Sequence, residues 1–213
     1  MNRNLKDHTI AINLKGITKG VFALLLGFFV GLLTLVGQKY LPESLNALAN
    51  SGAVWLIPAF FIALIARTKR FAISLCIETL VVCVLSYYWM ESMLNQHSFG
   101  WGNRYFYLWL ICAGIAGTIF GIGAFFYRQK SKHYYWGASL LPAVFFAEGL
   151  SELIHLPDYI HMFPAVLGKV IIGLVLYSVI YRKNLIKKMP LLSFFILTAL
   201  GLIGYELLYR LAI

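Results

Sequence analysis

Seven runs of apolar residues, separated by short polar segments, constrain the fold of this chain more than any other feature of its sequence. The runs cover roughly residues 17–38, 51–66, 71–91, 105–127, 134–154, 164–181 and 190–210. A helix needs about 20 mostly apolar residues to cross the hydrocarbon core of a bilayer. Charged residues make up only 12% of the 213, whereas soluble domains carry about 25%. The sequence therefore predicts an all-α transmembrane bundle of seven helices in a single domain, residues 1–213.

The loops between the runs are too short for a separate soluble catalytic domain. The three cysteines, Cys76, Cys83 and Cys112, all lie within apolar runs, where cysteine behaves as a small hydrophobic residue rather than as a disulfide or metal ligand. The HExxH, GxSxG and glycine-rich phosphate-loop motifs are missing from the sequence. We therefore predict no catalytic residue, no resident metal and no cofactor.

The basic residues predict how the chain is oriented. If the N-terminus, residues 1–16, is cytoplasmic, 14 of the 18 Lys and Arg residues fall in cytoplasmic segments and the C-terminus lies outside. The four that remain on the outer side are Lys39, Arg104, Lys169 and Arg210. Cytoplasmic loops are enriched in Lys and Arg, so this orientation is favoured. Topology and anionic lipid headgroups account for the net charge of +10, and no nucleic-acid partner is expected.

Local signals refine the individual helices. The first run is longer than the apolar region of a signal peptide, so we interpret it as a retained anchor. Ser51 or Asn50 is expected to cap the second helix, and Pro58 and Pro142 are expected to kink the helices that contain them. Residues 155–163 are expected to form a loop.

Acidic residues within the apolar runs are the best candidates for function, since a carboxylate in hydrocarbon is costly and faces a partner or a water-filled cavity. Glu78, Glu148 and Glu206 lie within runs, and Glu152 lies near a helix end. Glu206 and Arg210 have the i,i+4 spacing of a helical ion pair. Glu78 would either lock helix packing or form part of a proton or cation path.

The densest polar cluster is Glu148, Glu152 and His155, whose spacings of four and three place them on one helix face. Together with Lys169, and with Glu78 deeper, they predict an outward-facing polar pocket that binds a ligand. Two other interpretations stay open. Glu148 could simply pair with Lys169 while the rest of the cluster is hydrated, or the Glu152-x-x-His155 spacing could hold a metal, as in carboxylate-bridged bundles.

Small residues at four-residue spacing mark close helix contacts. Gly27 and Gly31 form a GxxxG pair in the first run, and Ala113, Gly117 and Gly121 repeat in the fourth. Such stripes allow backbones to approach closely. They would serve either packing within the chain or docking of a partner membrane subunit.

Two short motifs carry a resemblance to a known family. The segments Asn50-Ser51-Gly52-Ala53-Val54-Trp55 and Ala147-Glu148-Gly149-Leu150 resemble those of a family of small bacterial multi-pass membrane proteins of unknown function. The resemblance implies a bacterial plasma membrane location and no assigned activity. In size and helical character the chain is also similar to the S components of energy-coupling-factor transporters, with Gly20, Ala23, Gly27 and Gly31 as the corresponding docking residues, although that family has six helices.

These observations favour transport or binding of a small molecule or ion through the outward-facing pocket. One alternative is a non-enzymatic accessory subunit that docks a larger membrane complex. Another is a membrane-embedded hydrolase that uses a metal at the Glu/His cluster. The partners expected from the sequence are membrane lipids, a small-molecule or ion substrate, and a partner membrane subunit.

Overall fold

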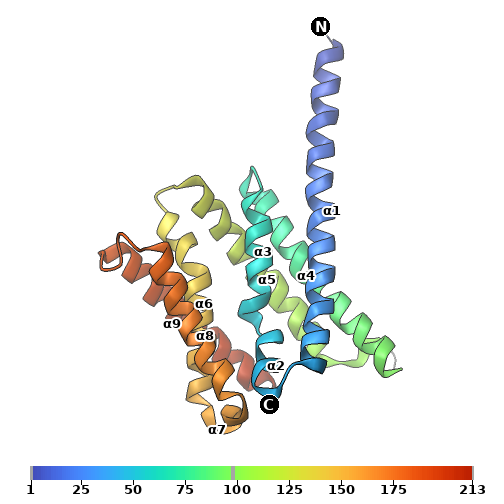
Figure 1. The fold of residues 1–213 in the computed structure, drawn as a ribbon. Coiled ribbons are helices and arrows are strands. Elements are labelled where there is room, and N and C mark those ends of the chain that lie inside the picture. Colours follow the sequence, from blue (N-terminus) through green and yellow to red (C-terminus); the bar gives the residue numbers. More distant parts are fainter. Residues whose placement is uncertain (1, 97–98, 213) are drawn as a thin grey trace.

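The structure, a computed structural model, describes residues 2–96 and 99–212 and contains only helices and turns within them (Figure 1). Its elements are α1 (Asn2–Tyr40), α2 (Glu43–Ala49), α3 (Gly52–Leu64), α4 (Lys69–Asn95), η1 (Gly100–Gly102), α5 (Arg104–Gln129), α6 (Tyr134–Ile154), α7 (Leu156–Tyr159), η2 (Ile160–Met162), α8 (Phe163–Ile180) and α9 (Lys188–Ala212). Among these residues, seven helical segments are long and apolar enough to span a membrane. The predicted all-α architecture, with seven helices long and apolar enough to span a membrane, is confirmed.

Two boundaries differ from those expected. The second span, Ser44–Leu64, begins earlier because α2 continues the apolar run of α3 on its N-terminal side. Residues 155–163, expected as a loop, form α7 and η2, and Pro157 stands in the first turn of α7, where its missing N–H is no loss. Ser51 caps α3 as expected, because its side chain accepts a hydrogen bond from the Val54 N–H at 3.3 Å.

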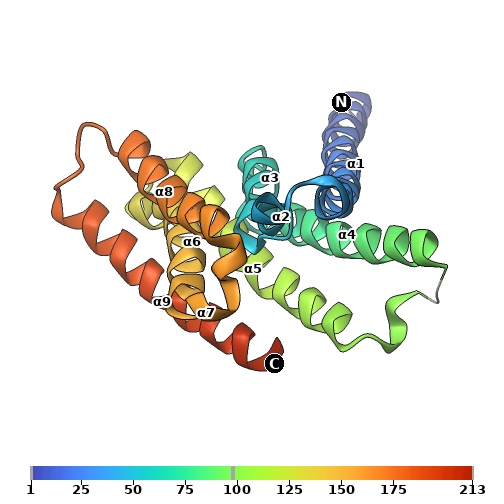
Figure 2. The same cartoon turned by 60° about the horizontal axis from the view of Figure 1, so that its bottom comes forward.

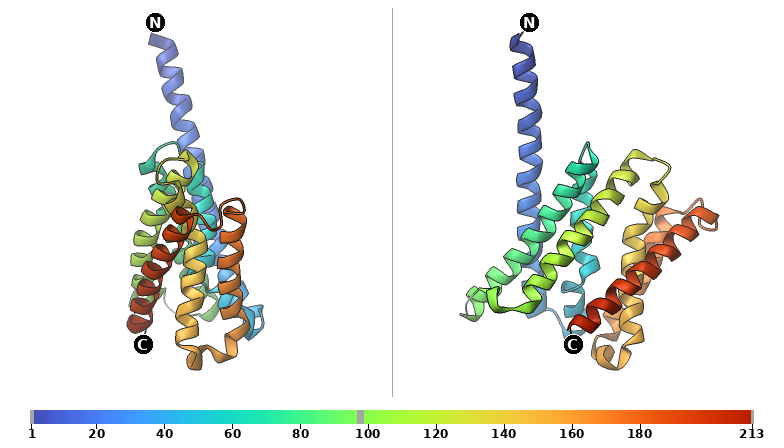
Figure 3. Two further views of the ribbon diagram at one scale, coloured as in Figure 1. Left: turned by 90° about the vertical axis from the view of Figure 1, so that its left-hand side faces the viewer. Right: turned by 180° about the vertical axis from the view of Figure 1, so that it is seen from behind.

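The helices form two groups, which Figure 2 shows side by side. One group contains α1, α3, α4 and α5, and the other contains α6, α8 and α9. Helix α5 packs on α6, α3 packs against α4, α5 and α6, and α2 reaches α8. The two further views in Figure 3 show the same division, with α8 and α9 against α6.

The small-residue stripes are used for packing within the chain. A Cβ added at Gly27 or Gly31 would collide with the α4 backbone at Thr79 or Cys83. On α5, a Cβ at Gly121 would lie 2.6 Å from the Ile73 Cα of α4. These glycines therefore let α1 and α5 approach α4 closely, as the packing interpretation predicts.

The basic ends of the helices gather on one side of the bundle. Figure 1 shows the N-terminus and the α3–α4 and α5–α6 turns at its upper end, and the C-terminus and α7 at its lower end. Two cations at the upper end bind carbonyls just after α3: the Lys19 ammonium donates to the carbonyl of Ile65, the C-cap, at 2.7 Å, and Arg128 donates to the Ala66 carbonyl. The last carbonyls of a helix lack intrahelical partners, so these contacts stabilise the end of α3.

Candidate functional site

Close contacts of α6 with α8 and α9 create the candidate site. A Cβ at Gly149 of α6 would lie 2.9 Å from the Val170 backbone nitrogen of α8, and one at Gly201 of α9 would lie 2.9 Å from the Ala147 Cβ. Glycine at 149 allows α8 to approach, because a Cβ there would crowd the Val170 side chain at 2.7 Å and also the backbone of Val170, which cannot move aside as a side chain can. Glu148 lies between Ala147 and Gly149 in the sequence, so α8 and α9 both pack close to its carboxylate.

Glu148 accepts hydrogen bonds from four groups on three other segments of the chain. Its Oε2 accepts from the Ser51 hydroxyl at 2.8 Å, the Ala53 N–H at 2.9 Å and the Tyr205 hydroxyl at 3.1 Å. Its Oε1 accepts from the Lys169 ammonium at 2.9 Å. Glu148 thus joins α6 to the start of α3, to α8 and to α9, and its carboxylate is fully satisfied.

The start of α3 contributes to the stability of this anion. The first N–H groups of a helix lack intrahelical partners and carry a partial positive charge. Ser51 is the N-cap of α3 and Ala53 lies in its first turn. The segment from Asn50 to Trp55 therefore meets the segment from Ala147 to Leu150, and the two motifs singled out in the sequence form one contact.

Lys169 connects Glu148 to a second acid. Its ammonium lies 2.9 Å from the Glu148 Oε1 and 2.5 Å from the Glu152 Oε1. The Lys169 side chain is 1% exposed and that of Glu152 is 15% exposed. The second oxygen of Glu152, Oε2, is buried and has no hydrogen-bond partner among the described residues. We call Glu148, Lys169 and Glu152 the acid–lysine triad.

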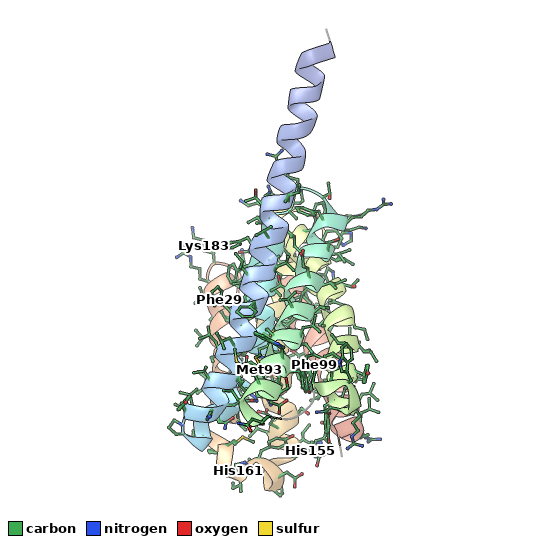
Figure 4. The ribbon with its side chains drawn as sticks, turned by 90° about the vertical axis from the view of Figure 1, so that its right-hand side faces the viewer. Phe29, Met93, Phe99, His155, His161 and Lys183 are labelled. Atoms are coloured by element: carbon green, nitrogen blue, oxygen red, sulfur yellow. The ribbon has the colours of Figure 1, made fainter. Side chains whose placement is uncertain are left out.

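His155 belongs to a neighbouring polar group rather than to the triad. Its Nε2 lies 2.9 Å from the Glu206 Oε2 of α9, and the Ser151 hydroxyl donates to the Glu206 Oε1 at 2.9 Å. The His155 ring stacks on Tyr209 with centroids 3.7 Å apart. Glu206, for which an i,i+4 partner was expected on its own helix, is hydrogen-bonded instead across the α6–α9 interface. Figure 4 shows His155 and His161 at the lower end of the bundle.

Glu78 is separate from the other predicted site residues. It lies on α4, half-buried against α1, where a Cβ at Gly20 would stand 3.8 Å from its Oε1. No hydrogen bond or salt bridge of its carboxylate is found within the described residues. The structure therefore brings together Glu148, Glu152 and Lys169, places His155 beside them, and leaves Glu78 in the other helix group.

The Glu152-x-x-His155 spacing does not create a metal site. Glu152 turns toward α8 and Lys169, whereas His155 turns toward α9 and Glu206. Among the described residues, no group of three or more His, Cys, Asp and Glu side chains is arranged to hold a metal ion. The hydrolase alternative thus has no ligand set in this part of the chain.

Sequence reasoning missed two contributors to the site. Ser51 was expected only as a helix cap, and its hydroxyl also donates to Glu148. Tyr205 is one of 13 tyrosines, and nothing in its local sequence distinguishes it from an interfacial anchor. Its proximity to Glu148 arises from the packing of α9 on α6, which no local signal encodes.

Comparisons with known proteins assign the chain to a family but do not indicate an activity. No curated protein and no solved structure matches it, so the similarity to the S components of energy-coupling-factor transporters finds no support. A family of unknown function, DUF6518, matches residues 12–211. This match covers all seven candidate spans and includes every residue of the acid–lysine triad. The chain therefore belongs to the DUF6518 family of unknown function.

Proposed function

We propose that the protein binds a small molecule or ion, specifically a small cation or a proton, at the acid–lysine triad and carries it across the plasma membrane. The observation that carries this proposal is the buried, unpartnered Oε2 of Glu152 beside Lys169. Glu152 and Lys169 would contact the solute. Glu148 would position Lys169, since its own acceptors are already occupied.

The charge of the triad favours a cationic solute. Two carboxylates face one ammonium, so the ionised triad has one negative charge in excess. A buried charge without a partner costs several kcal/mol or more in a medium of low dielectric constant. A proton or a small cation at Glu152 Oε2 would neutralise the triad. This balance supports exchange of a positive charge at Glu152 and argues against an anionic solute.

The proposal is tested by ion flux into proteoliposomes that contain the full chain. A pH-sensitive dye in the lumen reports proton entry, and radioactive sodium reports sodium entry. We expect at least one of these ions to enter faster than in protein-free vesicles, and Glu152→Gln to lower that rate at least tenfold. Glutamine keeps an acceptor oxygen for Lys169 while removing the exchangeable negative charge.

Glu91→Gln is the matched control, because Glu91 is also an acid near a helix end but lies on α4 in the other helix group. Its flux should stay within twofold of the wild-type value. Equal flux in wild type and Glu152→Gln, or no flux of either ion through the wild-type protein, contradicts the proposal. Unfolding curves of both variants show whether a lost flux reflects a lost fold.

The accessory-subunit alternative requires a surface other than the small-residue stripes. Gly27, Gly31, Gly117 and Gly121 all contact α4 within the chain, so they are not free to dock a partner. No other feature of the described residues favours that alternative over the transport proposal.

A further inference from the structure

The turn between α8 and α9 concentrates positive charge at the upper end of the bundle. It contains Arg182, Lys183, Lys187 and Lys188, all exposed. The sequence has no acidic residue between Asp158 and Glu206, so no acid on α8, on α9 before Glu206 or in the turn offsets this charge. Figure 4 shows Lys183 far from His155 and His161, on the side of the basic helix ends.

These four cations differ from basic residues in the other helix group. Lys19 and Arg128 donate hydrogen bonds to the carbonyls of Ile65 and Ala66, just after α3. Within the described residues, no hydrogen bond or salt bridge is found for the side chains of Arg182, Lys183, Lys187 or Lys188. Their donors are therefore available to an external anion.

The turn is folded rather than extended. The Tyr177 hydroxyl of α8 donates to the Leu185 carbonyl at 2.7 Å, and the Asn184 N–H donates to the Tyr181 carbonyl at 2.6 Å. This fold leaves Ile186 88% exposed next to Lys187. An exposed apolar side chain beside cations is suited to the boundary between lipid headgroups and acyl chains.

A hollow lies directly next to the cations on the outer face of α8. Its volume is about 420 Å³ and its lining residues are Leu174, Val175, Ser178, Val179 and Arg182. Three of these are aliphatic, and the Ser178 hydroxyl donates to the Leu174 carbonyl of its own helix. The hollow is therefore mostly apolar, and among the described residues Arg182 is the one charged residue that lines it.

We propose that this site binds an anionic phospholipid of the bilayer. The headgroup phosphate would lie between Arg182 and Lys183, and one acyl chain would lie along the hollow on α8. The phosphate would pair with Arg182 through two parallel N–H groups. Charge complementarity selects an anionic headgroup over a zwitterionic one, because the quaternary ammonium of a zwitterionic lipid would bring a positive charge beside four exposed cations. The apolar lining selects a lipid over a soluble phosphate. The site is independent of the acid–lysine triad, which lies toward the opposite end of α8.

Native mass spectrometry of the full chain in detergent tests the site with two lipids of identical acyl chains, phosphatidylglycerol and phosphatidylcholine. We expect phosphatidylglycerol to be retained at least tenfold more than phosphatidylcholine, since Lys and Arg residues near the membrane surface favour anionic headgroups. The double variant R182Q/K183Q should lose this preference. The matched control R67Q/K69Q removes two exposed cations, one in the α3–α4 turn and one at the start of α4, and should keep this preference.

Two further arms test the acyl chain. Val175→Trp fills the hollow and should lower phosphatidylglycerol retention severalfold with all four cations intact. Glycerol phosphate, which has the headgroup charge and no acyl chain, should not displace the bound lipid. Equal retention of the two lipids by the wild type, equal losses in the two double variants, unchanged retention in Val175→Trp, or displacement by glycerol phosphate would each overturn the proposal.

Discussion

Lys169 on α8 and Glu148 on α6 form an ion pair of 2.9 Å in which the lysine side chain is 1% exposed and the glutamate side chain 7% exposed. The pair joins two helices that run side by side, and Glu148 extends the connection to α3 and α9. A contact that involves four helices at one carboxylate contributes to the stability of the bundle as well as to the proposed site.

Removing Lys169 should be strongly destabilising. Lys169→Met leaves the buried carboxylate of Glu148 and the partly buried one of Glu152 without their cation, and loss of one partner of a buried ion pair costs about 3–5 kcal/mol. Thermal unfolding in detergent, followed by circular dichroism, measures the loss. In the double variant K169M/E148Q the uncompensated charge of Glu148 is gone, so its loss should be smaller than the sum of the single losses. Additive losses would show that the two side chains are not coupled.

Replacement of Gly149 should disturb the site through the backbone. Gly149→Ala places a Cβ 2.9 Å from the Val170 nitrogen, so α8 must move away from α6, and overpacking of this kind costs about 1–3 kcal/mol. Gly168→Ala is the control on α8, where a Cβ meets nothing within 4 Å. We expect a lower melting temperature for Gly149→Ala alone. Equal melting temperatures would argue against a close α6–α8 contact.

Two tyrosines of α9 should differ in their contribution to stability. Tyr205→Phe removes a donor to the buried Glu148 carboxylate, and hydrogen bonds to charged groups contribute about 1.5–3 kcal/mol. Tyr209→Phe removes an exposed hydrogen bond of 2.6 Å to Asp158, for which water can substitute. Chemical unfolding of both variants should show the larger loss for Tyr205→Phe, and the reverse order would contradict the described packing of α9.

The orientation predicted from charge can be tested with single cysteines. In a chain whose Cys76, Cys83 and Cys112 are replaced by alanine, Ser131→Cys lies in the α5–α6 turn and His161→Cys lies in η2. A membrane-impermeant maleimide added to intact cells should label His161→Cys and leave Ser131→Cys unlabelled until the cells are opened. The opposite pattern would place the N-terminus outside.

Much of the fold could be predicted locally. The run at 134–154 coincides with α6, and α4, α5, α8 and α9 lie within a few residues of their predicted positions, whereas α1 begins at Asn2, well before the apolar run at 17–38. Helix boundaries follow from apolar length, prolines and caps such as Ser51, all of which depend on neighbours in sequence. The short helices α2, η1, α7 and η2 were not predicted. In 155–163 the reason is that Pro157 is compatible with both a loop and a first helical turn.

The candidate site could be predicted in part. Glu148 and Lys169 were paired by the simple argument that a buried acid needs a cation, and the structure contains that pair. The i,i+4 spacing named Arg210 as the partner of Glu206, whereas the hydrogen bonds of Glu206 are to Ser151 and His155, which are adjacent to it only in space. Glu78 was grouped with the triad because it is an acid within a span, although it lies in the other helix group.

The sequence by itself determined that the chain forms seven apolar helices, which of their ends are basic, and which acids require partners, because apolar length and the cost of burying charge are properties of local composition. Only the tertiary structure decided which partner each acid found. That choice depends on which helices approach closely, and therefore on glycines such as Gly149 and Gly201 acting together with side chains distant in sequence. Glu152 is an example: its Oε2 becomes buried without a hydrogen-bond partner only when α6 packs against α8.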